Sequence, residues 1–206
     1  MKKRSGLAAS LALGLAGLLI SGCLVRSTEP WLTDTTKITT PSLDGVWQDA
    51  EEKTTAFFTA QGSNYLVRLV QEGRENSFFT ASLHRVDQYL LLDVGPTNDS
   101  GRMDVFVQMP VHLLFKAALA NDTLQLFGMS LDAAPARIRA SALAPALSGS
   151  KEKGFLVTAP AADLATFVRN QVNSPDLFQT NALFHFRKLA VAGNPAAAPA
   201  PAPYAP

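Results

Sequence analysis

The sequence has little of the chemistry that most enzymes and metal proteins need. It contains one cysteine, Cys23, which excludes an internal disulfide and any zinc site built from several thiolates. Its three histidines, His84, His112 and His185, are too far apart to form a local metal motif. A Gly-rich phosphate loop, a Gly-x-Ser-x-Gly elbow and a His-Glu-x-x-His motif are all missing. We therefore expect no metal, no cofactor and no enzymatic activity.

Long apolar runs are also missing, apart from one near the N-terminus. Three basic residues at positions 2–4 precede an apolar run over Leu7 to Ile20. This run is too short for a membrane-spanning helix, which needs about 20 apolar residues. A basic start followed by a short apolar run is typical of an export signal. We interpret residues 1–22 as a signal peptide and exclude them from the fold.

The signal ends in Ile20-Ser21-Gly22-Cys23, which resembles the lipobox of bacterial lipoproteins. The resemblance implies cleavage before Cys23 and fatty acylation of that cysteine, such as palmitate, as a membrane anchor. The next residue is Leu24 and not Asp, which resembles the pattern passed to the outer membrane in lipoproteins of the enterobacterial type. We expect an outer-membrane lipoprotein that faces the periplasm. The alternatives are an ordinary secretory signal with a chance cysteine and a short amphipathic anchor.

The charge balance argues against a polyanionic partner. The whole chain carries a net charge of +1, and residues 1–22 hold three basic and no acidic residues, so the mature chain carries −2. This balance gives no basic field, and we expect no nucleic-acid partner. The expected partners are the membrane, through the anchor, and another envelope protein or a small apolar molecule.

Composition divides the mature chain into three parts. Residues 23–41 combine the lipidated N-terminus with a Thr- and Ser-rich stretch that shows no periodicity, which favours a tether. Residues 193–206 are almost entirely Ala and Pro, a composition typical of a disordered tail. The region between them, residues 42–192, has the length of a single domain with one core.

The domain is dominated by β signals. Short runs rich in Val, Leu, Phe, Thr and Tyr alternate with turn sequences such as Gln61-Gly62-Ser63-Asn64 and Ala120-Asn121-Asp122. Successive strands joined by short turns predict an antiparallel meander that curls to protect its edges. Two helices are expected near the C-terminal part, one within residues 133–147 and one opening at Pro160, before a closing strand from Leu183 to Leu189. The predicted fold is mainly β with minor α: a curled antiparallel sheet or a small lipocalin-like barrel.

Alternation within the strands sorts their side chains into two faces. The opposite face of these strands carries Arg68, His84, His112 and Lys116. The inward face is mostly medium or large, which predicts a filled core without a sizeable ligand pocket. The inward residues are Tyr65, Val67, Leu69, Phe79, Ala81, Leu83, Val111, Leu113 and Phe115.

Nearly the whole domain, from Leu43 to Leu189, resembles a family of uncharacterised bacterial proteins, many of them exported or lipid-anchored. The resemblance implies no particular activity. It rests on the segments 43–47 (LDGVW), 89–94 (YLLLDV), 110–116 (PVHLLFK) and 122–124 (DTL), and on 156–159 (LVTA) followed by 163–167 (DLATF).

A looser resemblance is to lipocalins, whose barrels begin with a Gly-x-Trp like Gly45-Val46-Trp47. It implies that Trp47 closes one end of a barrel and that a basic residue of the last strand, Arg187, packs over it. A different small β fold with a Trp in its first strand is the alternative.

His112 and Lys116 are the other candidate binding residues. Both lie on the outward face of their strand, which the helix near Phe167 could cover. The acidic residues Asp93, Asp99 and Asp104 lack the spacing of a calcium loop, and we expect His84 and His185 to be solvated or capped at the surface. The sequence thus favours a non-enzymatic interaction or structural module. The alternative is a lipocalin-like carrier of a small apolar ligand.

Overall fold

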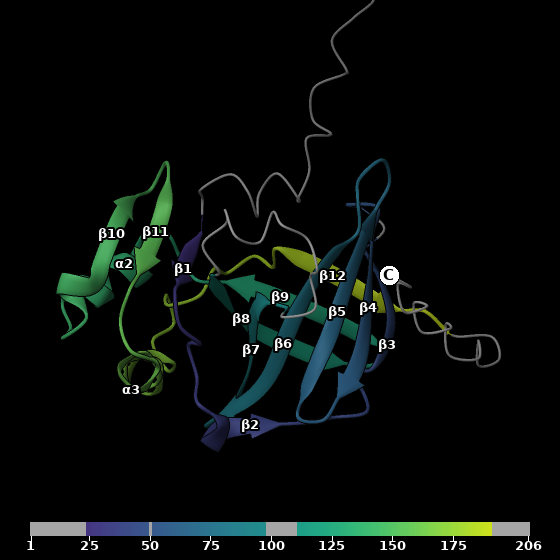
Figure 1. The fold of residues 1–206 in the computed structure, drawn as a ribbon, viewed down its shortest axis with the longest axis horizontal. Helices are drawn as coiled ribbons and strands as arrows, with labels where there is room; N and C mark the ends of the chain where they lie inside the picture. The colour runs from purple at the N-terminus through teal and green to yellow at the C-terminus, as the bar shows by residue number, and fades with distance from the viewer. Residues whose placement is uncertain (1–23, 50, 98–110, 191–206) are drawn as a thin grey trace, which may run out of the picture.

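The computed structural model describes residues 24–49, 51–97 and 111–190, which form a closed barrel of eight antiparallel strands with helices in the C-terminal half (Figure 1). Each barrel strand pairs with the next one along the chain, and the last strand pairs with the first. This up-and-down order confirms the predicted small antiparallel barrel. The barrel strands are β3 (Gly45–Asp49), β4 (Thr54–Gln61), β5 (Asn64–Gln71), β6 (Ser77–Val86), β7 (Tyr89–Pro96), β8 (His112–Ala120), β9 (Thr123–Gly128) and β12 (Phe184–Lys188).

The tight turns use residues that tolerate a left-handed backbone. Asn121 and Asp122 join β8 to β9 with φ of 48° and 58°, the pair of positive φ values that a type I′ turn requires. Gly62 joins β4 to β5 with φ of +60°. Both turns were predicted from the sequence, and they set the register that places alternate residues inside the barrel.

The barrel interior holds one continuous apolar cluster. The rings of Phe115 and Phe184 meet edge to face at 6.0 Å, and Phe184 stacks on Phe186 at 5.6 Å. The predicted inward residues belong to this cluster or pack against it, except Val111, which is half-buried just before β8. The buried members are Leu43, Trp47, Ala56, Phe58, Tyr65, Val67, Ala81, Leu83, Leu92, Phe115, Ala117, Leu124, Leu126, Phe184 and Phe186.

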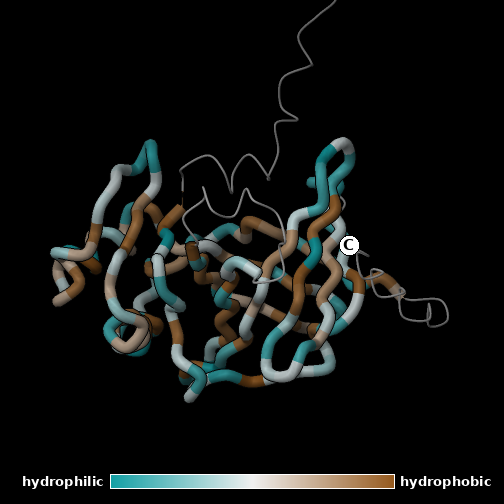
Figure 2. The backbone as a smooth tube through the Cα atoms, in the orientation of Figure 1, coloured by the Kyte–Doolittle hydropathy of each residue, from teal (hydrophilic) through white to brown (hydrophobic). Residues whose placement is uncertain are grey.

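A second apolar cluster lies outside the barrel, on the outer face of β7 and β8. There Leu91 and Leu114 pack with Leu164, Phe167 and Val168, the predicted apolar face of α3 (Ala161–Gln171). Figure 1 shows α3 on the same side of the barrel as α2 (Ala133–Arg139), β10 (Leu147–Ser150) and β11 (Gly154–Val157). β7 and β8 lie between the two clusters, and Figure 2 shows hydrophobic stretches along the central strands.

The first of the two helices is shorter than the predicted span of 133–147. It ends at Arg139, and a separate 3-10 turn, η3 (Ala144–Ala146), precedes β10. The Ser141 hydroxyl donates to the Ile138 carbonyl at 2.8 Å and accepts the Leu143 N–H at 3.1 Å. Such local side-chain bonds compete with helix continuation.

The expected tether over residues 23–41 is wrong for the part that the structure describes. Residues 25–27 form β1 (Val25–Ser27), which runs parallel to β11 and antiparallel to β8. The chain then runs along the strands of the barrel, through η1 (Asp34–Thr36), to β2 (Lys37–Ile38), which pairs with β6. Trp31, between them, is completely buried. Residues 25–38 therefore belong to the folded domain.

The predicted signal peptide, Cys23 and the Ala/Pro tail over 193–206 lie outside the described residues. Within 24–49, 51–97 and 111–190, neither helix has the length and apolar character that crossing a membrane requires.

Candidate functional site

The structure places a buried carboxylate at the centre of the candidate site. Asp93 lies in β7 with 2% of its surface exposed, and it points out of the barrel because its neighbours Leu92 and Val94 point in. Its Oδ2 accepts the backbone N–H of Trp31 at 2.6 Å, and its Oδ1 accepts a hydrogen bond from His112 Nδ1 at 2.8 Å. Asp93 therefore joins the N-terminal segment to two barrel strands.

His112 lies at the start of β8 and depends on a glycine for its position. A Cβ on Gly95, in the neighbouring strand, would lie 2.4 Å from the His112 Cε1 atom. Any side chain at position 95 would force the imidazole to shift, so glycine leaves the space that the imidazole occupies. The His112 carbonyl also accepts the Trp31 indole N–H at 3.4 Å. Trp31 thus contacts both members of the Asp93–His112 pair.

An imidazole that donates Nδ1–H to a carboxylate keeps a lone pair on Nε2, the arrangement of a general base or a metal ligand. His112 keeps 21% of its side chain exposed. Among the described residues, however, no group of three His, Cys, Asp or Glu side chains could hold a metal ion. In that same part of the chain, the hydrogen bonds of His112 and Asp93 run to each other and to Trp31. The pair therefore holds the N-terminal segment against β7 and β8 through Trp31.

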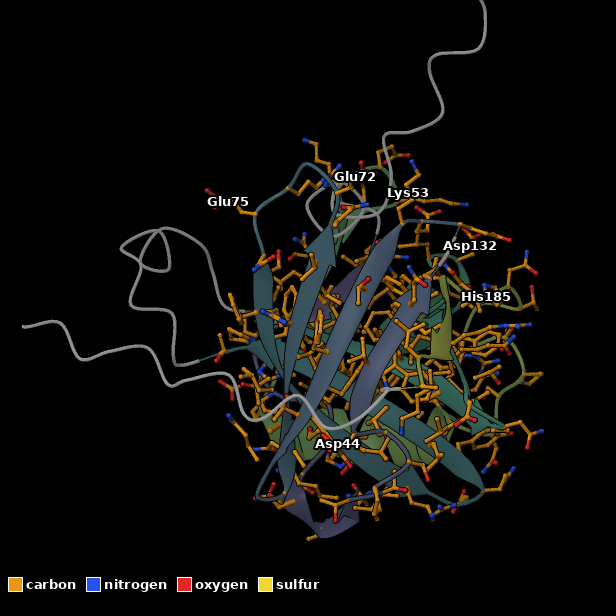
Figure 3. All side chains as sticks on the ribbon, turned by 90° about the vertical axis from the view of Figure 1, so that its right-hand side faces the viewer. Asp44, Lys53, Glu72, Glu75, Asp132 and His185 are labelled. Atoms are coloured by element: carbon orange, nitrogen blue, oxygen red, sulfur yellow. The ribbon has the colours of Figure 1, made fainter. Side chains whose placement is uncertain are left out.

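His84 fixes the same segment at a second point, which corrects the expected surface position. It is fully buried, with Nδ1 at 2.9 Å from Thr36 Oγ1 and Nε2 at 2.8 Å from Ser82 Oγ. Burial lowers the pKa of His84 to about 4, although the nearby Asp93 carboxylate acts in the opposite direction. The ring is therefore neutral at pH 7. His185, by contrast, lies at the surface as expected (Figure 3).

The burial of His84 predicts a loss of stability in mild acid. The unfolded chain takes up this proton near pH 6.5 and the folded chain only near pH 4. The stabilisation is therefore complete above pH 6.5 and is lost as pH falls toward 4, by up to about 3 kcal/mol. Urea unfolding between pH 7.5 and 4.5 should show a shallower pH dependence for His84→Gln than for the unmodified protein. His185→Gln is the control, and equal slopes for all three proteins would contradict the assignment.

Asp93 should be the most sensitive residue of this site. Asp93→Ala leaves two donors without an acceptor, the buried Trp31 N–H and the half-buried His112 Nδ1–H, and a buried unpaired donor costs about 1–3 kcal/mol. The control is Asp44→Ala, since Asp44 also accepts a backbone N–H, that of Ala60, but in an exposed place. We expect urea denaturation to show a loss several times larger for Asp93→Ala than for Asp44→Ala. Small losses of similar size in the two variants would show that Asp93 does not hold the N-terminal segment in place.

The last strand places a basic residue over Trp47, but it is not the predicted one. Trp47 is fully buried in β3, and its indole N–H donates to the Leu43 carbonyl at 2.8 Å. Lys188, not the predicted Arg187, lies over the Trp47 ring with Nζ 5.3 Å from its centroid. The register pairs Lys188 with Trp47, whereas Arg187 is exposed. The alternation in β12 carries this signal, because Phe184 and Phe186 point inward and Arg187 has the opposite parity.

The four candidate binding residues do not form one site. Lys116 lies on the same outward face of β8 as His112, but its Nζ is over the Phe127 ring, 4.8 Å from the centroid. Between them, Leu114 packs in the cluster that contains Phe167, which confirms the predicted helix cover. Trp47 is inside the barrel, and Arg187 is on its outer surface.

Sequence reasoning missed Asp93 as the centre of the site. The signal was present, because Asp93 interrupts the apolar run Leu90-Leu91-Leu92 and Val94. A carboxylate in a strand covered on both faces needs hydrogen-bond partners. These partners come from residues 62 and 19 positions away in sequence, so they could not be named without the fold.

No family model, curated protein or solved structure matches the chain. The resemblances to a bacterial family and to lipocalins therefore remain predictions, and the function is argued from this chain alone.

Proposed function

We propose that the protein is a lipid-anchored envelope protein whose barrel serves as a non-enzymatic interaction or structural module. The anchor is Cys23, and the expected location is the periplasmic side of the outer membrane. The observation that supports an interaction or structural module is the packing of the barrel interior. Large side chains from β3, β4, β5, β8 and β12 meet there in one cluster, and a barrel of about eight strands has an interior just wide enough for side chains to fill.

The chemistry of the buried polar groups supports a non-enzymatic role. A general base needs a substrate proton or a nucleophile within hydrogen-bond reach. The described hydrogen bonds of Asp93 and His112 are instead made to the N-terminal segment and to each other. Their role is to hold residues 24–38 on the barrel wall.

A lipocalin-like carrier is the second candidate, and Arg26 is the observation that favours it. Arg26 pairs with Leu113 across the β1–β8 ladder, and Leu113 packs against the interior cluster. Residues directly opposite in an antiparallel ladder share a face, so Arg26 lies on the interior side. Its Nε is buried, and among the described residues it has no hydrogen-bond partner. The anionic end of an apolar ligand would satisfy it.

Native mass spectrometry of the mature chain, purified with its lipid anchor removed, separates the two functions. The module predicts the mass of the polypeptide alone. A carrier would retain an apolar molecule of defined mass, and Arg26→Gln would reduce that adduct. Such an adduct would overturn the filled-interior proposal. The variant indicates whether Arg26 binds the ligand or merely lies near it.

A further inference from the structure

Leu24, the residue that directly follows the proposed lipid attachment site, is held within the fold. Leu24 is 7% exposed, and its carbonyl accepts the Phe155 N–H at 2.9 Å. Val25 then pairs with Phe155 in the parallel β1–β11 ladder. A single peptide bond therefore separates Cys23 from backbone that the sheet holds in place.

This connection leaves the domain little freedom above a membrane. The acyl chains on a lipidated cysteine lie in the hydrocarbon layer, which brings the residue itself to the headgroup boundary. A residue adds at most about 3.6 Å of reach. The surface around Leu24 must therefore lie within or against the headgroup layer, in contrast to a domain on a long tether.

The surface beside Leu24 is the turn between β10 and β11. The register pairs Val25 with Phe155, so Leu24 lies beside Gly154, and Lys153 comes directly before that glycine. The three turn residues, Lys151, Glu152 and Lys153, are exposed.

Two of the three turn residues already have partners. Lys151 Nζ is 2.7 Å from Asp132 Oδ1, and Glu152 accepts the Ser150 hydroxyl at 2.7 Å. Within the described ranges Lys153 makes no ion pair. Among the described residues, its charge is therefore unpaired beside Leu24.

We propose that the β10–β11 turn rests on the headgroups of the anchoring membrane, with Lys153 bound to a lipid phosphate, so that the barrel is held in one orientation. This inference rests on the proposed lipid anchor. Figure 1 shows the tip of the β10–β11 hairpin at one end of the molecule and β2 at the other. The β4–β5 turn lies at the β2 end and points away from the membrane in this orientation.

The charges at this end indicate that the anchor, and not an anionic surface, imposes the orientation. Glu72 and Glu75 lie at the upper end in Figure 3, together with Lys53, while Asp44 lies at the opposite end. A mixture of acidic and basic groups has no strong preference for anionic lipids. Zwitterionic headgroups also contain a phosphate, so Lys153 can bind a lipid phosphate without anionic lipids in the membrane.

Spin labels at two new cysteines test the orientation in the full lipidated protein. Lipidation occupies the only natural thiol, so Glu152→Cys and Ser63→Cys each provide a unique label site, one per end of the barrel. Both proteins are reconstituted into vesicles of phosphatidylcholine, and into vesicles of phosphatidylethanolamine with phosphatidylglycerol. Power saturation then compares the accessibility of each label to a water-soluble nickel chelate and to oxygen.

We expect the label at residue 152 to be shielded from the chelate in both vesicle types, and the label at residue 63 to remain accessible. Lys153→Ala should raise chelate access at residue 152, whereas Arg85→Ala, near the β2 end of β6, should leave it unchanged. Equal access at residues 152 and 63 in protein whose mass includes the lipid would overturn the orientation alone. Protein without lipid on Cys23 would overturn both the orientation and the proposed anchor.

Discussion

Replacing Trp31 with Ala is expected to lower the free energy of unfolding by about 3–5 kcal/mol, the range for removing a large aromatic side chain from a core. Trp31 is completely buried and packs in the cluster outside the barrel. Its backbone N–H is bound to Asp93, and its indole N–H to the His112 carbonyl. The substitution removes the contacts of the indole and opens a cavity between the N-terminal segment and β7–β8.

The size of this loss separates a structural segment from a tether. In a tether, truncation of one side chain changes stability by no more than about 0.5 kcal/mol, as at ordinary surface positions. Chemical denaturation of Trp31→Ala measures the difference directly. Phe78→Ala is the matched control, because Phe78 is also aromatic but is 47% exposed on the outside of β6. If Trp31→Ala lowers the free energy of unfolding as little as Phe78→Ala does, the N-terminal segment is a tether and not part of the fold.

The barrel could be predicted from the sequence because its signals are local. Alternation over β5 and β6 spans eight to ten residues, and the turns at Gly62 and Asn121-Asp122 carry their own backbone preferences. Neither depends on contacts between distant parts of the chain. The antiparallel order of the strands follows from short connections between consecutive strands.

The N-terminal segment could not be predicted because its strands are too short to show a period. β1 has three residues and β2 has two, and the nine residues between them, rich in Thr, show no regular alternation. What holds the segment is Trp31 in the outer cluster and the contacts to Asp93 and His84. Those partners lie far along the chain, so only the tertiary structure reveals the segment as part of the fold.

The misassigned basic residue over Trp47 has a different cause. The choice of Arg187 followed a loose resemblance to lipocalins rather than the parity of β12. Phe186 points into the barrel, which turns Arg187 outward and Lys188 inward. Lys188 then donates to the Ser42 carbonyl at 2.8 Å while it covers the Trp47 ring. Counting alternate positions from the buried phenylalanines would have named the correct residue.

Cys23→Ala is expected to abolish lipid attachment completely, since the thioether sulfur of the anchor can come only from the single cysteine of the chain. The variant should accumulate as an uncleaved precursor, because processing of a lipoprotein signal follows acylation of the cysteine. The control is Ser21→Ala, which keeps a small residue within Ile20-Ser21-Gly22-Cys23 and should still be lipidated.

Metabolic labelling with a fatty-acid analogue, followed by membrane fractionation, tests the central claim most directly. The account predicts label on the unmodified protein and on Ser21→Ala, both in the outer-membrane fraction, and no label on Cys23→Ala. Label that persists in Cys23→Ala, or an unmodified protein that carries no label, would contradict the lipid anchor.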